Sequence, residues 1–283
     1  MRRSKLLITP VLLWLALFLL VPMVIVVVMS LMSRDTLGNV VFHFSLNGYK
    51  TFFDSLYLGI YWDTLVLSVV TTVVCLLVSY PLAYFIANAS PRVQTWGLVL
   101  ITIPFWINFL IRTYAWVLLL RTQGVVNTLL IHFGWIQEPL QMLYTKGAVL
   151  LGMVYNFIPF MVLPIYVALE QMDKRLLDAA SDLGATRWKA FRHITLPQSK
   201  SGIMTGCVLV YVSTTGMFVV TDILGGAKST MISNIIQQQY LGARNWPFGS
   251  ALSVIFVITS LILILLFNRA MQSRADRAKE GRA

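Results

Sequence analysis

Two ionisable residues, Arg112 and Asp222, lie within long apolar runs of this sequence. A charge at membrane depth is costly, so an ionisable residue there is a functional candidate by default. A carboxylate at such a depth can compensate a cation that leaves water, whereas a guanidinium calls for an anionic partner. We therefore expect these residues to handle a charged cargo or to hold spans together.

Familiar catalytic and cofactor motifs are absent from the sequence. It contains no G-x-x-x-x-G-K-[ST], no H-E-x-x-H and no G-x-S-x-G. Among the eleven acidic residues only Asp222 lies well within an apolar run, which leaves no pair of carboxylates for an intramembrane hydrolase. The cysteines and histidines are scattered without metal-ligand spacing. We expect no enzyme activity, no metal site and no cofactor bound by this chain.

The elements that must position these residues are membrane-spanning helices. The chain of 283 residues is 58% hydrophobic and 12% charged, with a mean hydropathy of +0.76, whereas soluble domains have about 25% charged residues. We predict an all-α integral membrane protein with a single transmembrane domain, residues 1–283. Six apolar runs reach the roughly 20 residues that a span needs: 6–31, 62–88, 96–120, 147–169, 202–224 and 250–268.

The first apolar run is expected to remain as an anchor. It exceeds the roughly 7–15 residues of a signal-peptide core, and no small-residue cleavage site follows it.

The distribution of positive charges predicts the orientation of the chain in the membrane. Fifteen of the 22 lysines and arginines fall in the termini and in the loops after the second and fourth spans, against six in the opposite loops. The positive-inside rule then places both termini in the cytoplasm.

Nucleic acid is not an expected partner, although the net charge is +11. Channels for single strands alternate basic and aromatic residues, and the basic tail after Asn268 has no aromatic residue. Most of the basic residues are explained by orientation in the membrane.

The loop at residues 170–201 contains an amphipathic segment, LLDAASDLGATRWKAFRHITLP. Asp173 is placed to cap a first short helix, which Gly184 ends. Thr186 is placed to cap a second one, in which apolar residues recur every three positions until Pro197 ends it. Two interpretations stay open: a helix lying on the inner leaflet, or a short apolar face that docks in the groove of a soluble protein. Two aspartates on the polar face favour the protein partner.

This segment resembles a loop of a known family. The run Asp178-Ala179-Ala180-Ser181-Asp182-Leu183-Gly184, followed by Ile194-Thr195-Leu196-Pro197, is similar to the EAA loop of permease subunits in binding-protein-dependent ABC importers. Glycine and proline stand at that family's spacing, and Asp178 replaces its usual glutamate. The resemblance covers essentially the whole chain and narrows to the first permease of polyamine (spermidine/putrescine) importers. Four further stretches carry it: Pro104–Asn108 with Leu110–Arg112, Pro159–Pro164, Asp222–Gly226 and Asn245–Gly249.

The resemblance implies a type I ABC importer permease fold in the bacterial inner membrane. It implies three protein partners: a cytoplasmic ATPase dimer that binds ATP and Mg²⁺, a second, homologous permease chain, and a periplasmic substrate-binding protein. The surrounding lipid is the fourth partner. The loop residues expected to couple to the ATPase are Asp178, Ala179, Ala180, Gly184, Trp188, Phe191 and Pro197.

The resemblance also suggests where a polyamine passes. Asp222 is the candidate partner of an ammonium group, and aromatic faces add cation–π attraction, although a carboxylate near a span end also serves as a cap or a solvated group. Further candidates for the substrate path, which equally suit packing or interface belts, are Trp106, Asn108, Tyr114, Tyr155 and Asn156. The candidates for docking of the binding protein, in a loop that also suits a simple connector, are Asn245, Trp246 and Pro247.

Arg112 does not suit a cationic cargo, which it would repel. Its expected role is structural, by pairing with a carboxylate of this chain or of a partner, or by snorkelling outward; a gating role is the other possibility. It keeps an importer of another solute, such as an anion, open as an alternative. An autonomous secondary carrier is a further alternative, which predicts more intramembrane charge than we find.

Gly202 and Gly206 form a G-x-x-x-G motif that suits either a permease dimer or packing within the bundle.

Overall fold

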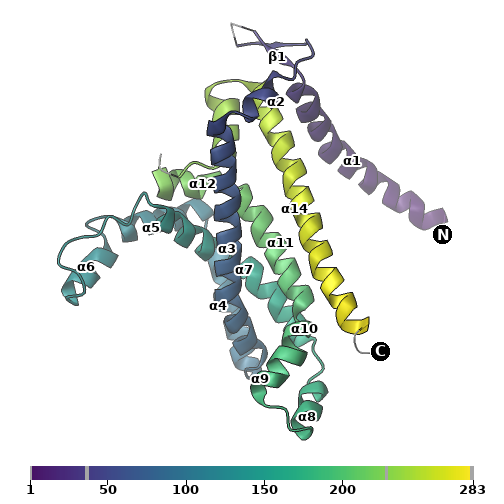
Figure 1. Ribbon diagram of the computed structural model, residues 1–283, viewed down its shortest axis with the longest axis vertical. Helices are drawn as coiled ribbons and strands as arrows, with labels where there is room; N and C mark the ends of the chain where they lie inside the picture. The colour runs from purple at the N-terminus through teal and green to yellow at the C-terminus, as the bar shows by residue number, and fades with distance from the viewer. Residues whose placement is uncertain (1, 36–37, 227–228, 281–283) are drawn as a thin grey trace. The chain divides into compact units, whose positions relative to one another are not determined.

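The computed structural model describes residues 2–35, 38–226 and 229–280, and these are mostly helical (Figure 1). The long helices are α1 (Arg2–Ser30), α3 (Ser55–Ala87), α7 (Lys146–Glu170) and α14 (Trp246–Glu280). A small antiparallel hairpin pairs β1 (Ser33–Arg34) with β2 (Val40–Val41). The shorter helices are α2 (Asn47–Phe52), α4 (Pro91–Trp106), α5 (Phe109–Leu120), α6 (Val125–His132), α8 (Arg175–Asp182), α9 (Arg187–Ala190), α10 (Leu196–Gln198), α11 (Lys200–Thr215), α12 (Phe218–Val220) and α13 (Ile232–Gln237). Wide π turns occur at η1 (Phe191–Thr195), η2 (Thr221–Gly225) and η4 (Gln238–Gly242).

The described residues form two compact units. The first combines the chain up to Trp62 with Ile232–Leu266, and the second is built mainly from Asp63–Met231. The first has its own small core, in which Phe52, Ile232, Phe248 and Leu252 are buried. The second contains the larger core and nearly all of the residues singled out above.

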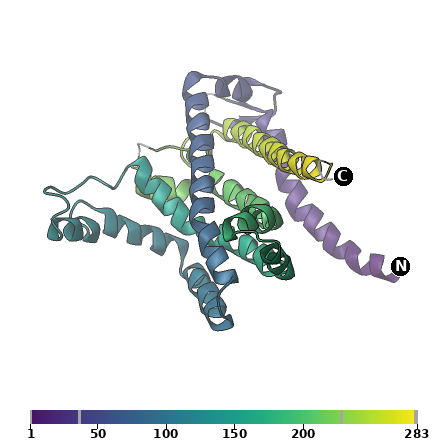
Figure 2. The same cartoon turned by 60° about the horizontal axis from the view of Figure 1, so that its bottom comes forward.

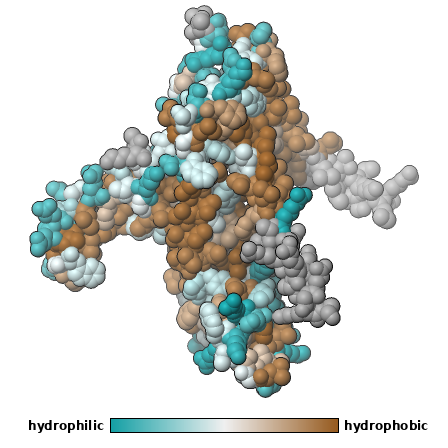
Figure 3. Space-filling view, in the orientation of Figure 1, coloured by the Kyte–Doolittle hydropathy of each residue, from teal (hydrophilic) through white to brown (hydrophobic). Residues whose placement is uncertain are grey.

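Four predicted spans are single helices. The runs at 6–31, 62–88, 147–169 and 250–268 correspond to α1, α3, α7 and the first part of α14. By length and composition, five described helices can cross a membrane, and a sixth crossing is added if one bent pair is counted. On the face drawn in Figure 3, hydrophobic residues gather along the long helices and hydrophilic ones over the loops. Such exposed apolar surface is what helices need in a lipid solvent.

The third predicted span, 96–120, is not one continuous helix. It is divided into α4 and α5 at Ile107, whose backbone is extended (φ −87°, ψ 135°). Asn108 stabilises the break, since its Oδ1 accepts a hydrogen bond of 2.8 Å from the Leu110 N–H. An asparagine cap offers the backbone an alternative to continuing the helix. The apolar stretch long enough to span is instead Phe109–His132, which joins α5 and α6.

The fifth predicted span, 202–224, is also broken. Helix α11 ends at Thr215, and the chain resumes as α12 and η2 at a bend of 56°. Thr214 and Thr215 donate hydrogen bonds of 2.9 Å to carbonyls three residues earlier, a pattern that bends helices. The bend directs the segment that carries Asp222 away from the axis of α11.

Helix α7 is the centre of the second unit, and α11 lies beside it (Figures 1 and 2). The approach is close at two glycines: a Cβ on Gly202 would lie 2.4 Å from the Pro164 carbonyl oxygen, and one on Gly206 would lie 2.7 Å from the Met161 Sδ. The G-x-x-x-G therefore packs within this chain.

Helix α3 faces the protein interior with a row of small residues. All of them are fully buried: Thr64, Ser68, Thr71, Cys75, Ser79 and Ala83.

Candidate functional site

The amphipathic loop folds as two short helices that meet at a glycine. Asp173 Oδ1 accepts a hydrogen bond of 3.0 Å from the Arg175 N–H at the start of α8. Gly184 follows α8 with φ +77°, a conformation that favours glycine. Thr186 caps α9 by accepting from the Lys189 N–H at 3.4 Å. These local features agree with the prediction from the sequence.

Pro197 does not end the second helix. The chain passes through the π turn η1, then α10, which contains Pro197, and enters α11 at Lys200. A proline in a regular α-helix collides with the carbonyl four residues earlier. The wider π turn that precedes Pro197 relieves this conflict, because its hydrogen bonds span five residues instead of four. The part of the loop after Thr186 thus leads into α11 through successive helical turns, whereas α8 is separated from it at Gly184.

The loop presents apolar side chains that no described part of the chain covers. Leu183 is 88% exposed and Trp188 is 68% exposed. Behind them, Phe191 stacks on Trp188 with ring centroids 5.6 Å apart and touches the ring edges of Tyr80 and Tyr84 on α3. Asp178 and Ala179 are exposed and Ala180 is half-buried. This arrangement offers an apolar face to a protein, and it ties that face to α3.

The contact with α3 was not anticipated from the sequence. The Tyr80 hydroxyl lies 3.0 Å from Ser199 Oγ, which adds a polar tie between α3 and the start of α11. The sequence feature that could have indicated it is the spacing of Tyr80 and Tyr84, which puts two aromatic rings on one helix face.

Asp222 lies on η2, beyond the bend of the fifth span, and its side chain is exposed. The turn is held firmly: a Cβ on Gly152 of α7 would lie 2.3 Å from Leu224 Cδ1, and one on Gly225 would lie 2.8 Å from Val149 Cγ2. Close packing of η2 on α7 therefore positions the carboxylate outside the core of the unit.

Arg112 lies on α5 and is 9% exposed. Its Cζ is 5.9 Å from the ring centroids of both Phe105 and Phe109, within cation–π range. Its Nε and Nη1 are buried and have no hydrogen-bond partner among the described residues. The guanidinium is therefore not snorkelling.

The other path candidates occupy different environments. Trp106 is 88% exposed and Tyr114 is 57% exposed. Tyr155 packs edge-on against Trp116 at 5.4 Å. Asn156 is buried, donates to the Gly152 carbonyl at 2.8 Å, and leaves its Oδ1 without a partner. Asn108 is engaged as the cap of α5.

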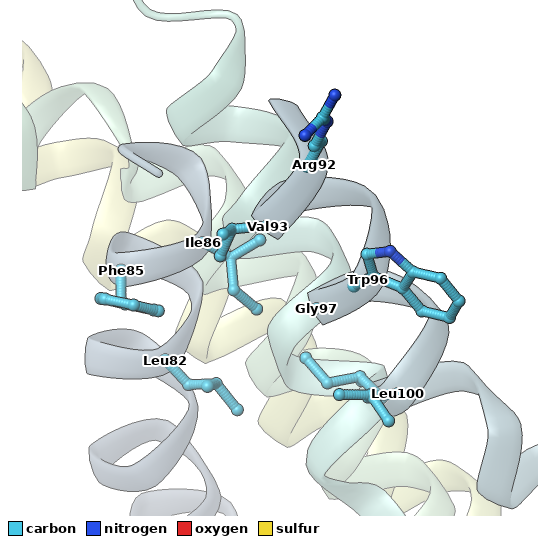
Figure 4. Close-up of a pocket in the computed structure, with 9 residues that line it drawn as sticks. Leu82, Phe85, Ile86, Arg92, Val93, Trp96, Gly97 and Leu100 are labelled. Carbon is cyan, nitrogen blue, oxygen red and sulfur yellow. The ribbon is translucent and has the colours of Figure 1, made fainter. Parts of the chain in front are cut away.

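Asp222 and the other five path candidates lie outside the three best-formed grooves of the described residues. These grooves are found around Leu82–Ile101, around Phe105–Leu209 and around Ile25–Ser250, and none of those candidates lines them. The first, about 360 Å³, lies between α3 and α4 and is apolar apart from Arg92 at one end (Figure 4). It lacks the carboxylates that a cation would need. In the described residues no cluster of three histidines, cysteines or acids suits a metal ion.

The three candidates for docking of the binding protein lie at the start of α14 or just before it. Asn245 Oδ1 accepts a hydrogen bond of 3.4 Å from the Phe248 N–H, so this residue caps the helix. Pro247 stands in the first turn of α14, where its missing N–H costs nothing. Trp246 is half exposed and lines a small groove with Ile25 and Met29 of α1. All three residues lie in the first unit.

Comparison with known proteins identifies the family. Residues 79–278 match the model for "Binding-protein-dependent transport system inner membrane component". The chain is 40% identical to the spermidine/putrescine transport system permease protein PotB of Haemophilus influenzae, over 91% of this chain and 90% of that protein. The chain belongs to this permease family. It is therefore an inner membrane component of a transport system and does not belong to an enzyme family.

Other relatives agree with this membership. PotB of Escherichia coli is 38% identical over 91% of this chain and 94% of that protein. Among solved structures, a chain of a bacterial ABC transporter that imports the acidic polysaccharide alginate superposes with a TM-score of 0.80, covering 96% of each chain. At 20% identity that likeness concerns the fold. A MetNI methionine ABC transporter chain superposes with a TM-score of 0.55 at 16% identity, covering 75% of this chain and 93% of that one. The permease thus has the type I ABC importer fold expected from its loop, while the cytoplasmic position of its termini stays a prediction.

Proposed function

We propose that this chain is a permease subunit of an ATP-driven importer of spermidine and putrescine. The observation that carries the proposal is the 40% identity to a spermidine/putrescine permease over 91% of the chain. Asp222 adds a physical argument, because an exposed carboxylate on a firmly packed turn is suited to an ammonium group.

The energy comes from a separate cytoplasmic ATPase dimer, which holds ATP and Mg²⁺; this chain binds no cofactor. The docking face is the loop with Leu183 and Trp188, whose large exposed apolar side chains call for a protein partner. When the ATPase closes, it moves this loop, and the loop moves α3 through Phe191 and α11 through direct continuity. The spans then rock between outward and inward openings.

The substrate path is completed by a second, homologous permease chain. The dispersal of the path candidates over separate environments supports this, because a path between two chains needs no closed pocket in either. A periplasmic binding protein delivers the polyamine to the outer loops, where Asn245, Trp246 and Pro247 are candidates for the contact. A binding protein is consistent with the family, whose members belong to binding-protein-dependent systems.

Arg112 favours one second candidate, an importer of an anion, since a buried guanidinium without an acceptor suits a carboxylate-bearing cargo. Uptake assays separate the two. Membrane vesicles containing the chain with its partners should take up labelled spermidine and putrescine, and an excess of an organic anion should not compete. Competition by the anion, with no uptake of polyamines, would overturn the polyamine assignment.

The complex itself tests the class of transporter. We would purify the tagged chain from its native host in mild detergent and identify stoichiometric partners by mass spectrometry. ATPase assays would then compare free spermidine, free putrescine and the polyamine-loaded binding protein. Co-purification of an ATPase and a second permease, with stimulation by the loaded binding protein, is the expected result. A chain that purifies alone and carries substrate unaided would be an autonomous carrier.

A further inference from the structure

Arg112 is a buried cation, and two of its guanidinium nitrogens lack hydrogen-bond acceptors among the described residues. The Phe105 and Phe109 rings flank the guanidinium at 5.9 Å, and Phe105 is itself braced by Phe160 of α7 at 5.2 Å. Ring faces attract a cation, but they do not replace the hydrogen bonds that Nε and Nη1 lose on leaving water. A desolvated charge in this state is stable only when an anion with good geometry completes it.

The described part of the chain does not supply that anion. Among the described residues Lys146 pairs with the Asp63 carboxylate at 3.3 Å, whereas no described carboxylate lies within 4.0 Å of the Arg112 guanidinium. The elements packed most closely against α5 are α6, α7 and η2, and α4 reaches Arg112 through Phe105; the charged residue on α4 is Arg92, a cation. The titratable or charged residues of α6, α7 and η2, together with the one other on α5 itself, are His132, Lys146, Tyr155, Tyr166, Glu170, Asp222 and Tyr114. The two acids are Glu170, at the far end of α7 from Tyr155, and Asp222, on the turn η2 that packs against α5. Asp222 is the internal alternative that a test must separate.

Cargo and lipid are poorer sources of the anion. A polyamine carries only positive charge and would be repelled by Arg112. A lipid phosphate sits at the membrane surface, where a long cationic side chain reaches it by extending its charged end outward. Arg112 instead keeps two of its three guanidinium nitrogens buried among aromatic rings.

Phe105, which lies against Arg112, also lines an open, largely apolar groove. Phe105, which forms one wall of the cation's environment, is 37% exposed. It also lines a groove of about 490 Å³ together with Pro164, Gly202 and Thr205. A helix of another membrane chain suits such a groove, because its lining is largely apolar and helices in a membrane associate by close side-chain packing. A carboxylate on that helix would complement the charge.

We propose that Arg112 forms an intramembrane ion pair with a carboxylate of the second permease chain, whose helix packs in the groove lined by Phe105. The pair would fix the register of the two chains and would keep the cation neutralised beside a path for cations. This inference rests on the proposed function, because a second permease is part of it.

The test compares Arg112→Met in the complex and in the chain alone. Methionine keeps much of the volume and removes the charge. In the complex, it leaves the partner's carboxylate buried and unpaired, so recovery of the second permease with the tagged chain should fall at least about tenfold. In the purified chain alone, the same change removes an uncompensated charge, so the melting temperature should rise. Arg121→Met, at an exposed arginine on the same polypeptide, is the matched control and should change neither quantity.

Charge reversal identifies the partner. Arg112→Glu should block assembly, and changing one intramembrane carboxylate of the second permease to lysine should restore it. Restoration by Asp222→Lys in this chain would overturn the proposal in favour of an internal pair. Unchanged recovery of the second permease with Arg112→Met would also overturn it.

The assembly readout does not depend on the cargo, so a wrong polyamine assignment leaves the test intact. A wild-type chain that recovers no second permease would overturn both this inference and the heteromeric part of the proposed function.

Discussion

The ring of Phe191 lies edge-on to the ring of Tyr84, with centroids 5.8 Å apart and an interplanar angle of 90°. Tyr80, one turn earlier on α3, contacts Phe191 at the same distance. Phe191 therefore holds the amphipathic loop to α3 by two aromatic contacts, while Trp188 stacks on it from the exposed side. Two links therefore attach the loop to α3, the second span: the Phe191 ring and the contact between the Tyr80 hydroxyl and Ser199.

Phe191→Ala should uncouple ATP hydrolysis from transport. Each aromatic pair contributes about 0.5–1.5 kcal/mol beyond its buried area, so loss of both ring contacts should weaken the link between loop and α3. The ATPase should still bind, because Leu183 and Trp188 remain exposed. We expect polyamine uptake per ATP hydrolysed to fall about tenfold, which corresponds to about 1.4 kcal/mol. Phe85→Ala, at the exposed neighbour of Tyr84, is the control; a normal ratio in the Phe191 variant would contradict the mechanism.

Gly184→Val should disrupt docking of the ATPase. Gly184 has φ +77°, a conformation that costs a residue with a side chain about 1–2 kcal/mol, although no atom lies within 4 Å of the added Cβ. A valine at this position would relieve the strain by adopting a negative φ, which would change the angle between α8 and α9. Pull-down of the ATPase should be lost while the chain's abundance in the membrane is kept. Gly134→Val introduces the same kind of strain, at φ +69° with open space around it, in a different loop, and should leave the pull-down normal.

Asp222→Asn should reduce polyamine uptake without affecting assembly. The amide keeps the shape and removes the negative charge, so a cationic cargo loses its compensating partner. We expect at least about a tenfold loss of uptake rate at low substrate concentration, equivalent to about 1.4 kcal/mol, with normal recovery of partner subunits. Asp63→Asn is the control, because its contact with Lys146 is exposed and such surface pairs contribute about 0–1 kcal/mol. Equal uptake by the Asp222 variant and wild type would remove this residue from the path.

Gly202→Ala should destabilise the second unit. The new methyl group would lie 2.4 Å from the Pro164 carbonyl oxygen and 2.7 Å from Ala168 Cβ, so α11 and α7 must separate. Overpacking of this kind costs about 1–3 kcal/mol. Thermal unfolding in detergent should therefore begin at a lower temperature. Gly59→Ala on α3 meets no atom within 4 Å and should raise the temperature slightly, by the better helix propensity of alanine. A Gly202 variant as stable as wild type would argue against this packing.

Much of the fold and of the loop was predictable from local sequence. Long apolar runs predict α1, α3, α7 and the start of α14, because hydrocarbon leaves the backbone no partner other than its own helix. The cap at Thr186 and the stop at Gly184 were predictable because each depends on a single residue and its nearest neighbours. The breaks at Ile107 and after Thr215, and the passage of the helix through Pro197, were not predicted, because hydropathy does not register a cap, a bend or a π turn.

The candidate site was predictable only in part. The sequence by itself determined that a charged residue interrupts an apolar run at Arg112 and at Asp222, and that residues 176–197 form an amphipathic segment. Only the tertiary structure decided that Arg112 is enclosed by two phenylalanines without an acceptor, while Asp222 is exposed beyond a bend. It also decided that Gly202 and Gly206 pack against α7. The reason is physical: composition and periodicity report the cost of placing a residue in lipid, whereas burial and pairing depend on which distant elements come into contact.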